Sequence, residues 1–250
     1  MHRLLRELSV GSWIQLGHPA VAEIMASAGF DWLAIDLEHS MIDLRETEEL
    51  IRVIDLKSVV PLVRLASNNP EQIKRVMDAG AHGIIVPMVN ACDEAEAAVA
   101  AVKYPPEGRR SIGLARAQGY GPRFQEYFEW QRENSLVIVQ IEHIDAVDNL
   151  ESILSVAGVD GYIVGPYDLS GSLGIPGEFE APKYLQALER ILKVSQEMDM
   201  PGGVHVVEPD PKQLKARIEE GHKFIAYGVD TRMLDTVCRA GLESIKNMKT

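Results

Sequence analysis

The sequence predicts an α/β protein, a (β/α)8 TIM barrel, and three observations support this fold class. Short apolar runs alternate with longer helix-like stretches along the chain. The unit of one strand and one helix recurs eight times, which is the number that closes a β/α barrel. The chain has 250 residues, 46% of them hydrophobic, and such barrels use about 250 residues as a single domain. A doubly wound sheet is the alternative, but it usually has fewer strands.

The expected strands are mostly continuous apolar runs, as in parallel strands that are covered on both faces. In chain order they occupy residues 11–16, 32–37, 60–65, 83–88, 136–141, 161–165, 202–207 and 224–228. The expected helices occupy residues 19–28, 43–56, 70–79, 93–103, 145–157, 181–199, 210–220 and 231–248. Pro19 and Pro70 stand where a first helical turn tolerates proline, and Asn69 is suited to cap the helix that follows. No linker divides residues 1–250, so we expect one domain.

A repeated junction joins helix to strand. A helix tail is followed by a glycine, by one or two residues, and then by a strand. The glycines of the four junctions are Gly29, Gly80, Gly158 and Gly221. Glycine ends helices readily because it adopts the left-handed conformation without steric strain, so we expect that conformation at all four positions.

The stretch 104–135 does not follow the repeat. It carries Pro105 and Pro106, several aromatic residues, and the pair Arg109 and Arg110. We expect a long loop here, and loops of that length usually serve function or an interface.

Composition excludes several classes of protein. Lysine and arginine number 25 and aspartate and glutamate 37, so the net charge is −12, which disfavours nucleic acid as a partner. Two cysteines, Cys92 and Cys238, cannot form a disulfide framework and indicate a reducing compartment. Neither a membrane-spanning apolar run nor a secretory signal core is visible, so we expect a cytoplasmic protein with no membrane partner.

Polar residues gather where the expected strands end, and the active site of a β/α barrel lies at the carboxyl ends of its strands. These residues are Asp36-Leu37-Glu38-His39, Arg64, Gln140-Ile141-Glu142 and Gly165-Pro166-Tyr167-Asp168. Together they supply a base, a cation, an amide and several carboxylates. His18 and His205 also lie near strand ends, as structural or substrate-adjacent residues.

Glu142 and Asp168 are the candidate metal ligands. Two carboxylates that face one point repel each other unless a cation lies between them. Carboxylate oxygens, with the other positions left to water and substrate, suit Mg²⁺ or Mn²⁺ better than zinc. The alternative is that both carboxylates are surface caps of loops.

His39 is the candidate general base because imidazole titrates near neutral pH. Asp36 could orient it, and Asp78 is a second candidate partner. Arg64 ends an apolar run, so it needs an anion, either a substrate or a carboxylate of the protein. The alternatives are a loop histidine without function and an internal salt bridge.

The chain resembles the HpcH/HpaI aldolase/citrate lyase family, whose class II pyruvate aldolases depend on a divalent metal. These enzymes act on 4-hydroxy-2-oxo acids such as 2,4-dihydroxyhept-2-enedioate and 2-keto-3-deoxy sugar acids. The similarity covers about residues 10–235, with several motifs in order. The motifs are Ala28-Gly29-Phe30-Asp31-Trp32, Ile35-Asp36-Leu37-Glu38-His39, Asn69-Pro70, Asp78-Ala79-Gly80, Val86-Pro87-Met88-Val89, Tyr104-Pro105-Pro106-Glu107-Gly108-Arg109-Arg110, Gln140-Ile141-Glu142 and Gly161 to Ser170.

The resemblance implies a role for each matching residue. His39 is the base, Asp78 the acid that raises its basicity, and Asp36 a helper. Arg64 stabilises the enolate-like transition state, and Gln140 contacts the pyruvyl part of the substrate. The segment Gly165-Pro166-Tyr167 meets the substrate carboxylate, and Glu142 and Asp168 hold Mg²⁺ or Mn²⁺.

The implied reaction cleaves a 4-hydroxy-2-oxo acid to pyruvate and an aldehyde. His39 would remove the proton of the 4-hydroxyl group, the C3–C4 bond would break, and Arg64 and the metal would stabilise the pyruvate enolate. The resemblance also implies a homo-oligomer, a hexamer or trimer, whose last helix packs on a neighbouring subunit.

Two other functions compete with this one. An acyl-CoA lyase or an oxaloacetate decarboxylase of the same superfamily would use the same scaffold, and the arginines of the long loop could form a basic channel for CoA. A non-catalytic barrel would lack one of the metal ligands or the base. This sequence has both candidate metal ligands and a candidate base. The segments Gln15 to His18 and Gly203 to Glu208 differ from familiar aldolases, so the aldehyde is left open.

Overall fold

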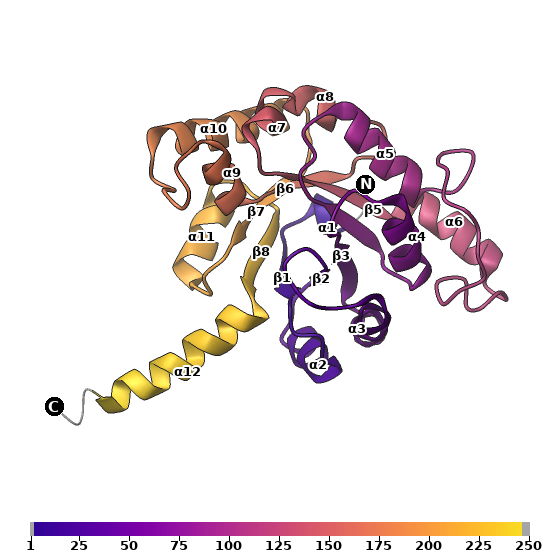
Figure 1. Ribbon diagram of the computed structural model, residues 1–250, viewed down its shortest axis with the longest axis horizontal. Helices are drawn as coiled ribbons and strands as arrows, with labels where there is room; N and C mark the ends of the chain where they lie inside the picture. Colours follow the sequence, from indigo (N-terminus) through magenta and orange to yellow (C-terminus); the bar gives the residue numbers. More distant parts are fainter. Residues whose placement is uncertain (1–2, 247–250) are drawn as a thin grey trace.

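The computed structural model describes residues 3–246 and contains a closed barrel of eight parallel strands (Figure 1). Neighbouring strands pair in chain order, and β8 pairs with β1. The strands are β1 (Ser9–Ile14), β2 (Trp32–Asp36), β3 (Val60–Arg64), β4 (Gly83–Val86), β5 (Leu136–Ile141), β6 (Gly161–Val164), β7 (Gly202–Val206) and β8 (Phe224–Val229). The predicted barrel is confirmed, and each strand lies within two residues of its expected bounds.

Helices connect the strands and surround the barrel, apart from α1, which precedes β1, and α12, which follows β8. They are α1 (Arg3–Arg6), α2 (Pro19–Ser27), α3 (Leu44–Leu56), α4 (Pro70–Asp78), α5 (Cys92–Val102), α6 (Phe124–Asn134), α7 (Ile144–Asp148), α8 (Leu150–Leu154), α9 (Pro166–Ser172), α10 (Pro182–Glu197), α11 (Pro211–Glu219) and α12 (Asp230–Lys246). The helix expected over 145–157 is two short helices, α7 and α8, which meet at Asn149. The last two residues of the helix expected over 231–248 lie outside the described residues.

The stretch 104–135 is not the long loop that we expected, because it contains α6. Rings of α6 pack on Tyr104, which is fully buried, and the ring centroids of Tyr104 and Tyr127 are 6.1 Å apart. Arg110 is buried beside them, with its guanidinium carbon 4.1 Å from the centroid of the Tyr104 ring. Most aromatic residues of this stretch therefore form one cluster, whereas Tyr120 is exposed.

The local signals in the sequence act as predicted. The four junction glycines all have left-handed backbone, with φ of 102° at Gly29, 101° at Gly80, 98° at Gly158 and 97° at Gly221. The side chain of Asn69 accepts hydrogen bonds from the backbone N–H groups of Glu71 and Gln72, so it caps α4 as expected.

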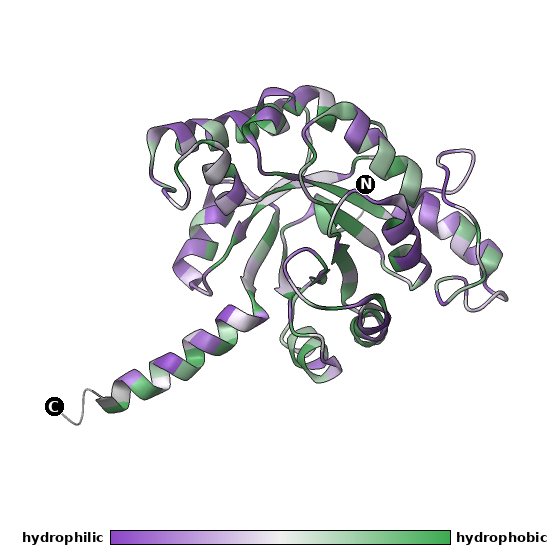
Figure 2. Cartoon of the chain, viewed as in Figure 1, coloured by the Kyte–Doolittle hydropathy of each residue, from purple (hydrophilic) through white to green (hydrophobic). Residues whose placement is uncertain are grey.

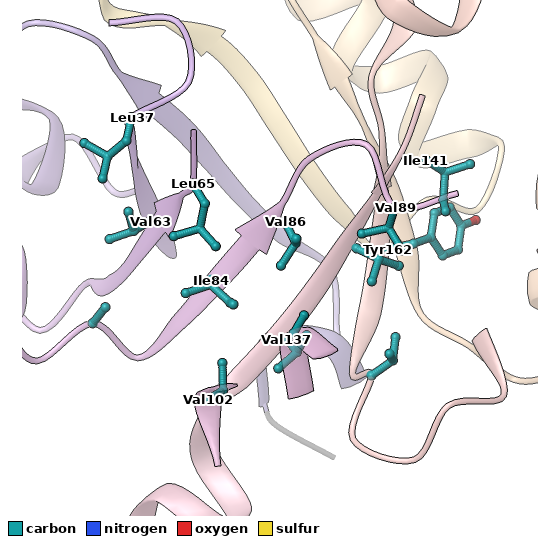
Figure 3. Close-up of a cluster of buried hydrophobic side chains, with 14 of the residues drawn as sticks. Leu37, Val63, Leu65, Ile84, Val86, Val89, Val102, Val137, Ile141 and Tyr162 are labelled. Carbon is teal, nitrogen blue, oxygen red and sulfur yellow. The ribbon is translucent and has the colours of Figure 1, made fainter. Parts of the chain in front are cut away.

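The apolar residues of β1 to β6 divide between two cores. Leu33 and Ile35 of β2 point outward into the larger core between barrel and helices, whereas Trp32 and Ala34 point into the barrel. Figure 3 shows part of the larger core, in which residues of β3 to β6 meet Leu37, Leu65, Val89 and Val102. Figure 2 shows that the strands are largely hydrophobic and that the helices mix both classes. This alternation decides which residues face the barrel axis at the strand ends.

The helix α12 leaves the barrel at the end of β8 and extends away from it (Figure 1). Several of its large apolar side chains are exposed, namely Leu234, Val237, Leu242 and Ile245. Apolar and polar residues alternate along its length (Figure 2). Within residues 3–246, none of the helices is both long and apolar enough to cross a membrane.

Candidate active site

Strand alternation brings the polar residues predicted at the strand ends to one place. Residues two apart on a strand face the same side, so Asp36 follows Trp32 and Ala34 toward the barrel axis. Arg64 follows Leu62 in the same way, and Gln140 follows Ile138. All three side chains therefore stand above the inner core, at the carboxyl ends of the strands.

Asp36 and Arg64 form a buried bidentate ion pair. Arg64 Nε donates to Asp36 Oδ1 at 2.9 Å, and Arg64 Nη2 donates to Oδ2 at 2.7 Å. Burial opposes the charge on Asp36, but the hydrogen bonds and charge of Arg64 outweigh it and hold the pKa of Asp36 below its usual value. The guanidinium carbon of Arg64 also lies 4.4 Å from the centroid of the Trp13 ring. Arg64 is thus held in a fixed orientation. Its partner is a carboxylate of the protein, which was one of the two possibilities that the sequence left open.

His39 lies beside this pair with an accessible ring. Its side chain is 56% exposed, and its Nε2 is 3.7 Å from Glu38 Oε2. Asp36 Oδ1 accepts hydrogen bonds from the backbone N–H groups of Glu38 and His39, at 3.0 and 3.2 Å. Asp36 therefore fixes the turn that carries His39, whereas Glu38 is the carboxylate close to its ring.

Glu38 is a site residue to which the sequence analysis gave no role. Its Oε2 is buried, has no hydrogen-bond partner in the described part of the chain, and lies 3.3 Å from Arg64 Nη1. Burial raises the pKa of Glu38 to about 7 against the charge of Arg64, and repulsion from Asp36 and Asp168 adds to the effect. The sequence feature that could have identified Glu38 as a site residue is its position between Asp36 and His39, at the end of a strand.

Glu142 is buried directly after β5 and is held by two donors. Met88 N–H donates to its Oε1 at 2.7 Å, and Gln140 Nε2 donates to its Oε2. Met88 has left-handed backbone with φ of 52°, an uncommon conformation for a residue other than glycine. A Cβ atom at Gly165 would lie 2.5 Å from Glu142 Oε2, so a residue without a side chain is needed there.

The carboxylates of Glu38, Glu142 and Asp168 influence one another electrostatically. Burial raises the pKa of Glu142 to about 7, and the charges of Glu38 and Asp168 push it in the same direction. Asp168 is in the first turn of α9, which begins at Pro166. Repulsion of the buried Glu142 carboxylate by Glu38 and Asp168 is what a bound cation would relieve, as is the Glu38 oxygen that lacks a hydrogen-bond partner among the described residues, so these residues fit a divalent metal. Within residues 3–246 no cluster of three or more His, Cys, Asp and Glu side chains is arranged to hold a metal.

Tyr167 stands at the edge of this group. Its side chain is exposed, and its ring packs edge-on against Phe179, with centroids 5.1 Å apart. Pro166 is buried at the start of α9, and Gly165 N–H donates to the carbonyl of Ile141. The segment Gly165-Pro166-Tyr167 therefore links Glu142 to Asp168.

Asp78 is not near His39 within the chain. It is the last residue of α4 and lies where the strands begin, whereas His39 follows the end of β2. Its Oδ1 is 3.7 Å from Arg110 Nη1. Burial raises the pKa of Asp78 against the charge of Arg110 and a hydrogen bond from Gln118. One copy of the chain does not bring Asp78 to the candidate base.

The arginines of the stretch 104–135 also lie away from the strand ends that carry His39. Arg116 Nη2 donates to Asp55 at 2.6 Å and its Nη1 to the carbonyl of Ala79, both at the opposite end of the barrel. Arg123 pairs with Glu126. Arg110, Arg116 and Arg123 are therefore engaged with groups of the chain itself, whereas Arg109 is exposed, and these arginines do not line the candidate site.

His18 and His205 have separate places. His18 caps α2, because its Nδ1 accepts a hydrogen bond from Ala20 N–H. His205 lies inside the barrel with Nε2 3.1 Å from the carbonyl oxygen of Gly228, and its ring packs edge-on against Trp13. Burial lowers the pKa of His205 to about 4, so it is neutral near Arg64 and Asp36.

Comparison with known proteins agrees with this geometry. A family model described as HpcH/HpaI aldolase/citrate lyase matches residues 9–236. The hydroxypyruvate/pyruvate aldolase of Sagittula stellata is 38% identical over 232 residues, which cover 92% of this chain and 90% of that protein. The 4-hydroxy-2-oxo-heptane-1,7-dioate aldolase of Salmonella typhimurium is 39% identical over 228 residues, which cover 90% of this chain and 85% of that protein.

A solved structure supports the same relationship. An HpcH/HpaI aldolase/citrate lyase family protein of Burkholderia cenocepacia superimposes with a TM-score of 0.92 at 32% identity, covering 98% of this chain and 97% of that one. The family match extends across every strand of the barrel. The chain therefore belongs to the HpcH/HpaI aldolase/citrate lyase family.

Proposed function

We propose that this protein is a metal-dependent aldolase that cleaves a 4-hydroxy-2-oxo acid to pyruvate and an aldehyde. The observation that carries the proposal is the convergence of the Asp36–Arg64 pair with Glu38, Glu142 and Asp168 at one end of the barrel. Relatives at 38% and 39% identity are named hydroxypyruvate/pyruvate aldolase and 4-hydroxy-2-oxo-heptane-1,7-dioate aldolase. The substrates are small molecules, a 2-oxo acid and an aldehyde.

Glu142 and Asp168 would hold the divalent metal, Mg²⁺ or Mn²⁺, through carboxylate oxygens. When bound, such an ion supplies Lewis-acid polarisation of the 2-oxo acid. Gln140 donates to Glu142 and so sets its orientation, which is how outer residues tune metal ligands. The amide oxygen of Gln140 has no hydrogen-bond partner within residues 3–246, so this residue also offers an acceptor to substrate.

His39 acts as the general base in this proposal. Its ring is exposed at the mouth of the site, where it can reach the 4-hydroxyl proton of a bound substrate. Arg64 stabilises the negative charge that develops on the enolate oxygen as the C3–C4 bond breaks. Asp36 holds Arg64 and the His39 turn in place, and the segment Gly165-Pro166-Tyr167 receives the substrate carboxylate.

A homo-oligomer, a trimer or hexamer, is part of the proposal. The helix α12 carries exposed Leu234, Val237 and Leu242 away from the barrel, and a second copy of the chain would cover them. Asp78 can raise the basicity of His39 only across such a contact, because it lies at the opposite end of its own barrel. Both cysteines are free, which fits the reducing cytoplasm as the location.

Release of pyruvate tests the proposed reaction. The protein is incubated with a panel of 4-hydroxy-2-oxo acids, with Mg²⁺ or Mn²⁺ and then with a chelator, and pyruvate is followed by a coupled assay. Release that depends on metal supports the proposal. Failure with every acid, combined with thioester cleavage or oxaloacetate decarboxylation, would favour the acyl-CoA lyase or decarboxylase alternative instead.

A further inference from the structure

We infer that Gln15 is a positioning residue for the Asp36–Arg64 pair and that the first turn of α12 holds Gln15 in place. The role that Arg64 plays in turnover rests on the proposed function, whereas the placement of Arg64 does not. Gln15 follows the end of β1, two residues after Trp13, so it faces the same interior as Asp36 and Arg64.

A continuous chain of hydrogen bonds runs from α12 to the candidate site. Thr231 Oγ1 donates to Gln15 Oε1 at 3.2 Å, and Gln15 Nε2 donates to Asp36 Oδ2 at 2.9 Å. The same Asp36 oxygen accepts from Arg64 Nη2. An ionised carboxylate only accepts, so Asp36 fixes which end of the Gln15 amide faces it and leaves the amide oxygen for Thr231.

The backbone of Gln15 is held by the same turn of α12. The carboxylate of Asp230, which is buried, accepts from the backbone N–H of Gln15 at 3.0 Å and of Leu16 at 2.9 Å. Both the side chain and the backbone of Gln15 therefore depend on where α12 begins. Buried charge-assisted bonds of this kind are strong and directional.

The two oxygens of the Asp36 carboxylate are held differently. Among the described residues, Oδ1 accepts from Arg64 Nε and from the backbone N–H groups of Glu38 and His39, whereas Oδ2 accepts from Arg64 Nη2 and Gln15. Without the Gln15 donor, Oδ2 would keep Arg64 alone, and the carboxylate could pivot about Oδ1 with the guanidinium. Arg64 would then lose its fixed position above Trp13.

Gln15→Glu and Gln15→Met separate positioning from packing. Gln15→Glu keeps the shape and the bond from Thr231 but replaces the donor with a charge that repels Asp36. Gln15→Met keeps the volume without either bond. In both variants we expect kcat to fall about 10- to 100-fold with little change in KM, because the misplaced group acts in the transition state.

Substitutions of Thr231 test the same chain of hydrogen bonds with a smaller expected effect on kcat. Thr231→Val removes the donor to Gln15 and should lower kcat less, whereas Thr231→Ser retains a hydroxyl and should restore it. Adding Thr231→Val to Gln15→Met should lower kcat no further, because both act along one chain of bonds. Ser12→Ala is the matched control, since Ser12 on β1 donates to the Gly228 carbonyl and has no bond to Asp36.

A second measurement does not depend on turnover. The Nε–H of Arg64, assigned in ¹⁵N spectra by its loss in Arg64→Lys, should exchange with solvent faster in Gln15→Met than in the wild type. Equal protection in both proteins would overturn the inference whatever reaction is catalysed. A wild type that releases no pyruvate while Arg64 exchange still responds to Gln15 would instead refute the proposed function alone.

Discussion

Arg64 is constrained on three sides. Asp36 binds it in a bidentate pair, the Trp13 ring lies against its face, and Glu38 lies 3.3 Å from its Nη1. A cation held in this way needs no reorganisation when negative charge develops beside it, which is the main source of electrostatic catalysis. Arg64 is therefore held by side chains that also restrain one another.

Loss of either candidate metal ligand should abolish turnover with the fold intact. Glu142→Gln and Asp168→Asn keep the size of each side chain but remove the charge that binds a cation. We expect Mn²⁺ binding, measured by calorimetry, and pyruvate release at limiting metal both to fall by about two orders of magnitude or more. Glu151→Gln, at an exposed carboxylate of α8, is the control. Wild-type turnover by either variant at limiting metal would disprove the metal assignment.

Replacing the candidate base should separate two reactions of the same site. In His39→Ala, aldol cleavage should fall about 10²- to 10⁴-fold because no base takes the 4-hydroxyl proton. Exchange of the pyruvate methyl protons with D₂O, followed by NMR, should fall far less, since enolisation uses a different proton route. Equal loss of both reactions would remove this specific role from His39.

At the scale of elements, the segment between α5 and β5 is held down by a buried lysine. Lys103 Nζ donates to the carbonyl oxygens of Gln131, Arg132 and Ser135, at the end of α6. This lysine therefore serves the carboxyl end of α6, where unpaired carbonyl groups need donors.

Lys103→Met should loosen α6. The change leaves three carbonyl groups without their donor and should lower the free energy of unfolding by about 2–3 kcal/mol, measured in urea. Lys193→Met, at an exposed lysine of α10, should change it by less than about 0.5 kcal/mol. Similar values for the two variants would show that Lys103 contributes nothing to the attachment of α6.

At the scale of the whole molecule, the barrel interior is filled by apolar side chains, and the polar residues of the candidate site lie at the carboxyl ends of the strands. Buried rings of Trp13, Trp32 and Phe224 fill its interior, with Trp32 stacked on Phe224 at a centroid distance of 4.3 Å. A Cβ atom at Gly11 would lie 2.0 Å from the Trp32 ring, so the close packing of β1 on this ring requires glycine. The polar residues of the candidate site lie above these packed rings.

Global stability should depend on a buried histidine before β8. Burial, with the charge of Arg217, lowers the pKa of His222 to about 4 from its usual 6.5. Between pH 6.5 and pH 4, His222 therefore binds a proton in the unfolded chain but not in the folded chain. The free energy of unfolding falls by about 1 kcal/mol per pH unit as the pH drops through this range. Glu220, 3.7 Å from its Nε2, does not offset the burial.

The measurement is the free energy of unfolding at pH 7 and pH 5 for the wild type and His222→Gln. Glutamine cannot take up the proton, so the wild type should lose more stability than the variant over this range. His205 has a pKa lowered in the same way and remains in both proteins, so it cancels in the comparison. Parallel pH profiles would contradict the prediction.

Local signals predicted most of the fold, because they act over a few residues. The four glycine junctions, the cap at Asn69 and the apolar strands are all short-range features, and each is confirmed. The helix α6 was missed because its aromatic side chains pack on Tyr104 from another segment. The break at Asn149 was likewise not visible in the apolar pattern.

The residue types of the candidate site were predicted from strand ends and from resemblance, but their contacts were not. Glu38 and Gln15 had no assigned role, although both lie at or just after strand ends that the sequence located. Their partners, Arg64 and Asp36, lie on neighbouring strands, and the parallel pairing of β1 with β2 and of β2 with β3 brings these side chains together. Asp78 had an implied role, yet its place at the opposite end of the barrel follows from the direction of α4.

The sequence by itself determined the barrel, its strands and the family of the chain, because these depend on local patterns repeated along it. Only the tertiary structure decided which carboxylates share a site, which arginine is held and by what, and that α12 holds Gln15. The physical reason is that charges and hydrogen bonds act over a few ångströms between side chains far apart in sequence. Their energies are set by burial and geometry, which no single segment encodes.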